Sequence, residues 1–183
     1  MTTYVALLRG INVGGNNPIK MTDLEAGLGA LGYRNVRTYL TTGNAIFSTA
    51  PTDARTLETE IEAAIAHTFS TPVRVLVRNL EQMKALLEAI DELWKPEPNE
   101  RQNVIFLAPE IDRKQVLDGL QPKPAIEAVH YRPGALLWAA KRRYLTRSTM
   151  LKLNKMSIYQ GMTVRSPSTT RRIYELMREV DAT

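Results

Sequence analysis

The sequence predicts an α+β protein built from two ferredoxin-like βαββαβ units in tandem, with an extra C-terminal helix. Short apolar segments typical of strands alternate with amphipathic segments typical of helices, and the same order occurs twice. A proline-rich stretch, Lys95-Pro96-Glu97-Pro98-Asn99, separates the two runs. Because proline cannot continue a helix or join a central strand, we predict domains at residues 1–94 and 102–183, joined by a linker at 95–101.

The first half begins with an apolar strand at residues 4–8, followed by a glycine-rich loop. Thr22 and Glu25 form a capping-box pattern, which predicts the start of the first helix. Gly32 predicts the end of this helix, because glycine readily takes the left-handed conformation that terminates helices. The other predicted elements are strands at 36–40, 45–48 and 73–77, a helix from Asp53 to Phe69, and a helix capped by Asn79.

The second half repeats this order after the proline-rich stretch. Its last helix is predicted to begin at Ser166, a good capping residue, followed by Pro167 at the first helical position. The other predicted elements are strands at 103–107, 126–131, 135–140 and 162–165, and helices at 112–120 and 148–159.

The composition excludes several kinds of chemistry. The chain has no cysteine, which removes disulfides, thiolate nucleophiles, iron–sulfur clusters and cysteine zinc sites. Its two histidines, His67 and His130, would need carboxylate help to hold a metal. We therefore predict no metal and no cofactor.

The net charge of +5 favours anionic partners such as nucleic acid or a phosphorylated small molecule. No apolar run approaches the length of a membrane span, and the first residues lack the basic region of a signal peptide. We expect a cytoplasmic protein that does not bind membranes. The sequence leaves the oligomeric state open.

The glycine-rich loop is one candidate site for an anion. Glycines permit positive φ and close backbone approach, so successive N–H groups there could surround a phosphate or carboxylate. The loop matches neither the dinucleotide-binding pattern nor a P-loop, and the alternative is a long connection that needs glycine for its path. The candidate residues are Arg9, Gly10, Asn12, Gly14, Gly15, Asn16 and Lys20, with Gly43 and Asn44 from a later turn.

A second candidate is a stretch of positive charge. From Lys141 to Tyr174 the chain contains no Asp or Glu. A solvated face normally mixes both signs, so a stretch of one sign indicates an anionic partner. The alternative is pairing with acids elsewhere, such as Glu58, Glu60 and Glu62.

Two places within this stretch favour a phosphate. The spacing of Ser148, Lys152 and Lys155 predicts that they share a helix face, which Tyr159 extends. The start of the last helix combines hydroxyl groups with a positive dipole end, although a well-capped helix would look the same. The candidate residues of the stretch are Lys141, Arg142, Arg143, Ser148, Lys152, Arg165, Ser166, Thr169 and Arg171.

The loop motif resembles a known family. The residues Leu8-Arg9-Gly10-Ile11-Asn12-Val13-Gly14-Gly15, Met21, Leu24, Val36-Arg37-Thr38-Tyr39 and Gly43-Asn44 are similar to the signature of the bacterial domain-of-unknown-function 1697 family. The resemblance covers the whole chain and implies an α+β fold of duplicated ferredoxin-like units. It implies no established activity, cofactor or catalytic residue.

A C-terminal pattern extends the resemblance. Thr163, Arg165 and Thr169 match residues that the family tends to show, while Ser166 stands in place of an asparagine. In the earlier turn, Thr42 stands where the family usually has serine.

These observations lead to three hypotheses. The first is a module that binds an anionic ligand through the basic stretch, with the glycine-rich loop as a possible second part. The second is an enzyme that acts on a phosphorylated or carboxylated small molecule, for which Arg9, Asn12, Asn44 and Arg165 would line one pocket and an Asp, a Glu or Lys141 would act as base. The third is a structural or interaction protein.

Overall fold

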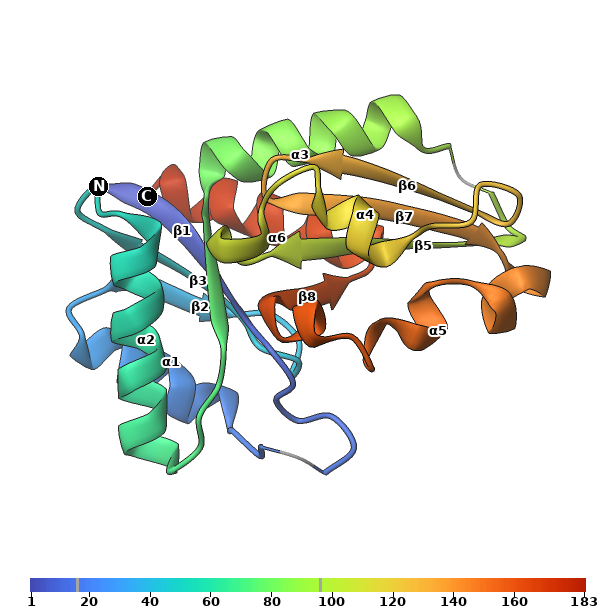
Figure 1. Cartoon of the computed structure of the whole chain (residues 1–183). Coiled ribbons are helices and arrows are strands. Elements are labelled where there is room, and N and C mark those ends of the chain that lie inside the picture. Colours follow the sequence, from blue (N-terminus) through green and yellow to red (C-terminus); the bar gives the residue numbers. More distant parts are fainter. Residues whose placement is uncertain (16, 96) are drawn as a thin grey trace. The chain divides into compact units, whose positions relative to one another are not determined.

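The computed structural model of the chain describes residues 1–15, 17–95 and 97–183. It contains two four-stranded antiparallel sheets backed by helices, together with a C-terminal helix (Figure 1). Each sheet has its strands in the order second, third, first, fourth, which is the order of a ferredoxin-like unit. The predicted α+β fold class is confirmed.

The chain forms two compact units. Unit 1 comprises residues 1–84 and 171–183, and unit 2 comprises residues 85–170. The divisions fall inside helix α3 (Leu80–Leu93) and near the start of helix α6 (Pro167–Asp181), so most of the C-terminal helix belongs to unit 1. The predicted division into domains at residues 1–94 and 102–183, joined by a linker at 95–101, stays a prediction.

Unit 1 packs two helices on one face of its sheet. Phe47 lies in this core between Tyr4 and Tyr33, with ring centroids 5.9 and 4.4 Å away. On the other face, Thr3 donates a hydrogen bond to Asp181 of α6 at 2.9 Å. The elements are β1 (Thr2–Leu8), α1 (Met21–Ala30), β2 (Arg34–Thr38), β3 (Asn44–Thr49), α2 (Ala54–Phe69) and β4 (Val75–Asn79).

Unit 2 has a similar sheet but shorter helices. Its core is centred on Trp138, which is almost fully buried. The elements are β5 (Glu100–Leu107), the 3₁₀ helix η1 (Pro109–Ile111), α4 (Val116–Leu120), β6 (Glu127–Arg132), β7 (Ala135–Lys141), η2 (Arg142–Arg147), α5 (Met150–Leu153), η3 (Ser157–Gly161) and β8 (Met162–Arg165). Strand β5 begins inside the predicted linker, and Pro96 of that linker lies outside the described residues.

Three sequence predictions about helices are wrong. The helix predicted at 148–159 is broken into α5 and η3, so Ser148 and Tyr159 do not share a continuous helix face. Ser148 is instead buried, with its hydroxyl donating to the Leu145 carbonyl at 2.8 Å. The helix predicted at 112–120 begins only at Val116, because the Asp112 carboxylate accepts the Gly134 N–H and holds the chain in a turn.

The capping box at Thr22 is the third. Helix α1 starts at Met21, with Lys20 at the N-cap position and no side-chain capping bond. Glu25 reaches away from the helix start and accepts hydrogen bonds from the N–H and the hydroxyl of Thr38, both at 2.8 Å. The carboxylate therefore satisfies the edge strand β2 rather than the helix.

The other edge of this sheet is satisfied in the same way. Strand β4 lies at the edge, and two of its N–H groups donate to glutamates of α2. Val77 donates to Glu58 at 3.0 Å and Val75 donates to Glu62 at 2.9 Å. Helix carboxylates thus take up edge N–H groups that would otherwise lack a partner.

The Glu58 carboxylate is buried with only one of its two oxygens hydrogen-bonded to the described residues. Its side chain is fully buried, its Oε2 atom accepts no hydrogen bond from the described residues, and Arg55 lies 3.6 Å away. Burial raises the pKa of Glu58 above its ordinary value of 4.5, although the Val77 N–H and nearby arginines oppose the shift. Because the folded pKa is raised, this carboxyl contributes less stability as pH rises above its unfolded value.

We expect Glu58→Gln to be at least as stable as the wild type at pH 7, with a gain of up to about 1 kcal/mol. The amide oxygen can still accept from Val77, and position 58 itself no longer carries a buried charge. Urea unfolding at pH 4 and pH 7 measures the difference, which should grow with pH. Glu62→Gln is the control, since Glu62 is partly exposed and its Oε1 atom lies 3.7 Å from Arg74 Nε. A larger loss for Glu58→Gln than for Glu62→Gln at pH 7 would contradict this account.

No helix in the described ranges is both long enough and apolar enough to span a membrane.

Candidate functional site

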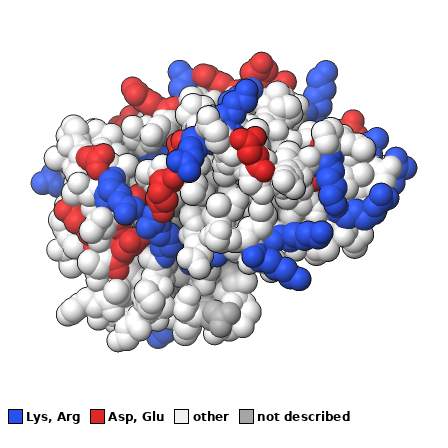
Figure 2. Space-filling view, in the orientation of Figure 1, with Lys and Arg blue, Asp and Glu red and all other residues white. Residues whose placement is uncertain are grey.

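The clearest candidate site is the basic segment, which we define as residues 141–155 of unit 2. It leaves the end of β7 and continues through η2 and α5. Lysine and arginine gather over this region at the right-hand end of the view in Figure 2. Among the residues that the structure describes, its six cations form no ion pair and all are exposed. They are Lys141, Arg142, Arg143, Arg147, Lys152 and Lys155.

The 3₁₀ helix η2 has three residues per turn, so side chains three apart lie above one another. Leu145 packs against the core of unit 2, whereas Arg142, at the first position of the helix, is exposed. Tyr144 and Arg147 form another row, with the Arg147 Cζ atom 6.0 Å from the Tyr144 ring centroid. Arg143 Cζ lies closer, at 4.7 Å from the same ring.

The start of η2 is attached to the chain before β5. The backbone N–H of Arg142 donates to the Asn99 carbonyl at 2.7 Å, and its Nε donates to the Pro98 carbonyl at 3.4 Å. Strand β7 also pairs Lys141 with Glu100 in register. The first part of the basic segment is therefore held in place by backbone contacts rather than by acids.

A buried glutamate attaches the second part. The Glu127 carboxylate accepts hydrogen bonds from Trp138 Nε1 at 2.7 Å and from the Lys123 N–H at 3.0 Å. It also accepts from the N–H and the hydroxyl of Thr149, the residue just before α5. The Lys123 ammonium donates to the Arg147 carbonyl at 3.0 Å. Glu127 thus links β6 and β7 to the start of α5.

The acids named as alternative partners for these cations have other contacts. Glu58 and Glu62 accept the edge N–H groups of β4, and Glu60 accepts the Tyr33 hydroxyl at 2.9 Å. This hydrogen bond and burial together raise the pKa of Tyr33, with burial the larger cause. All four residues belong to unit 1, so this network is internal to that unit.

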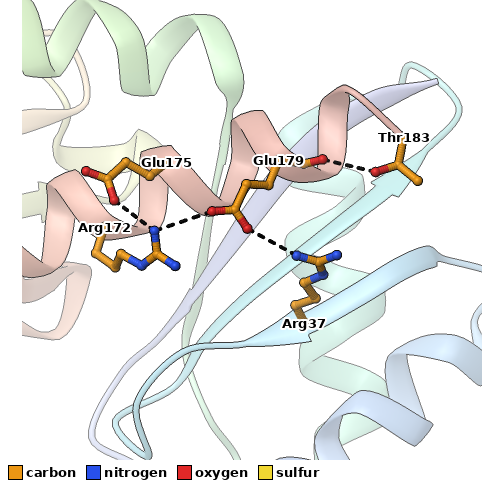
Figure 3. Close-up of polar contacts among 5 residues, drawn as sticks. All are labelled: Arg37, Arg172, Glu175, Glu179 and Thr183. Atoms are coloured by element: carbon orange, nitrogen blue, oxygen red, sulfur yellow. Dashed lines mark hydrogen bonds and ion pairs between the residues drawn. The ribbon is translucent and has the colours of Figure 1, made fainter.

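The predicted stretch from Lys141 to Tyr174 is divided between the two units. Arg171 and Arg172 belong to unit 1. Arg172 lies 2.8 Å from Glu175 and 3.4 Å from Glu179, and Glu179 also contacts Arg37 at 3.3 Å (Figure 3). Arg172 is therefore neutralised by acids that follow it on α6.

The start of α6 is well capped. Ser166 Oγ accepts the Thr169 N–H at 3.1 Å, which confirms the predicted cap, and it also donates to the Thr169 hydroxyl at 2.9 Å. Arg165, at the end of β8, is buried and donates to the Thr163 hydroxyl and the Val164 carbonyl, both at 2.9 Å. Burial lowers the pKa of Arg165 to about 10. The roles of these residues in ligand binding stay predictions.

In the glycine-rich loop, the Asn12 side chain holds the loop together. Its amide donates to the carbonyls of Ile19 and Thr41, and its oxygen accepts the Ile19 N–H, all at 2.8 Å. Gly10, Gly14 and Gly15 have positive φ, as predicted for the loop. Asn16 lies outside the described residues. Arg9 is partly buried and Lys20 is exposed.

The turn before β3 packs against this loop. Gly43 has a φ of +83°, and its carbonyl accepts the Leu8 N–H at 2.8 Å. Asn44 is fully buried and donates to the Tyr39 carbonyl at 2.8 Å. Asn12 and Asn44 therefore stabilise the fold through their amides, and a direct role of either in ligand binding stays a prediction.

Among the described residues, no three His, Asp or Glu side chains come together as a metal site would require. Arg9, Asn12 and Asn44 belong to unit 1, whereas Arg165 belongs to unit 2. The enzyme hypothesis that joined them in one pocket stays a prediction.

Comparison with known proteins places the chain in a family. A family model described as a protein of unknown function, DUF1697, matches residues 1–138, which is more than half of the chain. The chain belongs to the DUF1697 family. The conserved bacterial protein SP0830 from Streptococcus pneumoniae is similar to this DUF1697 protein in structure, with a TM-score of 0.84 and 25% sequence identity over 96% of this chain and 98% of that chain. No curated protein matches significantly. The family is one of unknown function, so it assigns no ligand or reaction.

Two residues of the site were not predicted from the sequence. Tyr144 lies inside the basic stretch, and its position between Arg143 and Arg147 was a usable signal. Glu127 comes before the stretch and is separated from Thr149 by a strand and a 3₁₀ helix. No local pattern marks it, because its partners come together only in the folded unit.

Proposed function

We propose that this DUF1697 protein binds nucleic acid through the basic segment of unit 2. The observation that carries the proposal is the set of six exposed cations with no ion pair among the described residues. Unpaired cations repel one another, so such a surface is best stabilised by an anionic partner. A phosphate backbone offers regularly spaced negative charges and releases its counterions on binding.

A phosphorylated metabolite is less well supported. Small ligands bind in pockets that bury most of their surface. The cavity beside the basic segment, bordered by Thr149, Met150 and Leu153, has a volume of only about 10 Å³ and an apolar lining. An extended polyanion needs an exposed charged surface and no such pocket, so the geometry favours nucleic acid.

The test is fluorescence anisotropy of labelled single- and double-stranded oligonucleotides at two salt concentrations. We expect binding at low salt that weakens steeply as salt is raised. No binding of either oligonucleotide at low salt would reject the proposed function.

Replacing Arg142 and Arg143 by Ala should reduce the salt dependence. The slope of log K against log salt is negative. Each phosphate contact that is lost should reduce its magnitude by about 0.9 for duplex DNA or about 0.7 for a single strand. The control is Arg113→Ala with Lys114→Ala, which removes the same charge from an exposed part of unit 2 outside the basic segment. Equal changes in both double variants would mean that net charge, and not this segment, determines binding.

A further inference from the structure

We propose that the nucleic acid is bound as a single strand, with one base stacked on a platform formed by Arg143 and Tyr144. This inference rests on the proposed function and names the class of ligand. It is based on the ring contacts and the secondary structure of the basic segment, which are independent of its charge.

The platform is a guanidinium that lies over an aromatic ring. Arg143 Cζ lies 4.7 Å from the Tyr144 ring centroid, and Arg147 Cζ lies 6.0 Å from it. Both arginines are exposed and Tyr144 is half-buried. A guanidinium is planar, so its outer face can stack on a base while its inner face remains on the ring.

The backbone supports this arrangement. Leu145 packs into the core of unit 2, and the Arg142 N–H donates to the Asn99 carbonyl at 2.7 Å. The residues on either side of the Arg143–Tyr144 pair are thus held in place. Because the chain around the pair is already ordered, binding does not have to order it, and the entropic cost of binding is lower.

The elements of the basic segment are poorly suited to duplex DNA. Reading a groove requires an α-helix or a two-stranded ribbon that lies along it. Here η2 is a 3₁₀ helix of 6 residues and α5 has 4 residues. Bases in a duplex are already stacked on their neighbours, whereas a single strand can place an unstacked base on the platform.

An exposed apolar side chain adds a second observation. Leu151 is 58% exposed and lies between the platform and Lys152 in sequence. Phosphates gain nothing from an apolar surface, but the face of a base does. A segment that combines unpaired cations, a stacked arginine and an exposed leucine therefore matches a strand that offers both phosphates and bases.

Two variants that keep the net charge test the platform. Arg143→Lys retains the charge but loses the planar group, and Tyr144→Leu retains an apolar side chain but loses the ring. We expect each to weaken binding of a single-stranded oligonucleotide by about tenfold, with an unchanged salt slope. Arg113→Lys, at an exposed arginine of unit 2 outside the basic segment, is the matched control and should change the affinity by less than about twofold. Thermal unfolding of each variant verifies that the fold is retained.

An abasic oligonucleotide of the same length separates the two proposals. The wild type should bind it about tenfold more weakly than the normal strand, and the two platform variants should bind it like the wild type. Equal affinity of the wild type for normal and abasic strands, or tighter binding of duplex than of single strand, would overturn the platform while leaving the proposed function in place. Failure to bind any of these oligonucleotides would overturn both.

Discussion

Gly43→Ala is expected to destabilise the protein more than the replacement by alanine of any other glycine that the structure describes. At a φ of +83°, an alanine is strained by about 1–2 kcal/mol. Its Cβ would also lie 2.7 Å from Leu8 Cβ and 2.8 Å from Ile11 Cδ1, both in the fully buried core. Overpacking of this kind costs about 1–3 kcal/mol, so the total loss should be about 2–5 kcal/mol. Urea unfolding of the variant measures it.

Gly14→Ala is the matched control for this experiment. Gly14 also has a positive φ, +59°, but a Cβ there would meet nothing within 4 Å. Only the backbone strain should remain, about 1–2 kcal/mol. The difference between the two variants isolates the packing of the turn against Leu8 and Ile11. Equal losses would show that this close approach does not matter.

Glu127→Ala should produce the second large effect, a loss of about 3 kcal/mol or more. The substitution leaves the donors of Trp138, Thr149 and Lys123 without their acceptor. The buried Trp138 donor alone costs about 1–3 kcal/mol when it is unpaired, and the partly buried donors of Thr149 and Lys123 add to this loss. Glu127 is 5% exposed, so water cannot easily replace the carboxylate. Urea unfolding measures the loss, and Glu127→Gln, which keeps one acceptor oxygen, should fall between Ala and wild type.

The same residue should also affect the pH dependence of stability. Burial acts to raise the pKa of Glu127, but the hydrogen bonds from Thr149, Trp138 and Lys123 outweigh it and hold the pKa below its ordinary value of 4.5. The unfolded chain therefore binds this proton more tightly than the folded chain does. The contribution of Glu127 to stability is complete above the unfolded pKa and is lost as pH falls through the folded pKa.

Unfolding free energies measured from pH 7 down to pH 3 check this behaviour. The wild type should lose stability below about pH 4.5 more steeply than Glu127→Gln, which has no carboxyl to protonate at this position. Parallel curves for the two proteins would contradict the assigned role of the carboxylate.

The sequence predicted local features of the fold well. Asn79 caps α3 as predicted, by accepting the Gln82 N–H at 2.8 Å. Asp53, predicted as the start of its helix, is the N-cap of α2 and accepts the Thr56 N–H at 3.1 Å. Such caps depend on residues only three apart, so they are visible without knowledge of the fold. The predicted repeat of βαββαβ also implied a ferredoxin-like strand order in each half, and both sheets have that order.

Features that depend on distant partners could not be predicted. Glu25 fits a capping box by spacing, but in the folded unit it binds Thr38 on an edge strand. The helix expected at 148–159 is interrupted after four α-helical residues, in a part of the chain whose start is held by Glu127. In both cases tertiary contacts outweigh local preference.

The candidate site was likewise only partly predictable from the sequence. The run of cations was visible in the sequence, because the absence of acids is a property of the chain itself. The division of that run, with Arg172 paired to Glu175 and Glu179 in unit 1, required the structure. So did the Arg143–Tyr144 contact, since adjacency in the sequence does not place a guanidinium over its neighbour's ring.

The carboxylates that bind the edges of the unit 1 sheet have a consequence for the behaviour of the protein in a crowded cell. An open sheet edge is a template on which another chain can add a strand, and repeated addition leads to aggregates. On β4, the N–H groups of Val75 and Val77 already donate to Glu62 and Glu58, and on β2 the Thr38 N–H donates to Glu25. An incoming strand would have to displace these glutamates before it could pair there. The helices of unit 1 thus protect their own sheet from self-association.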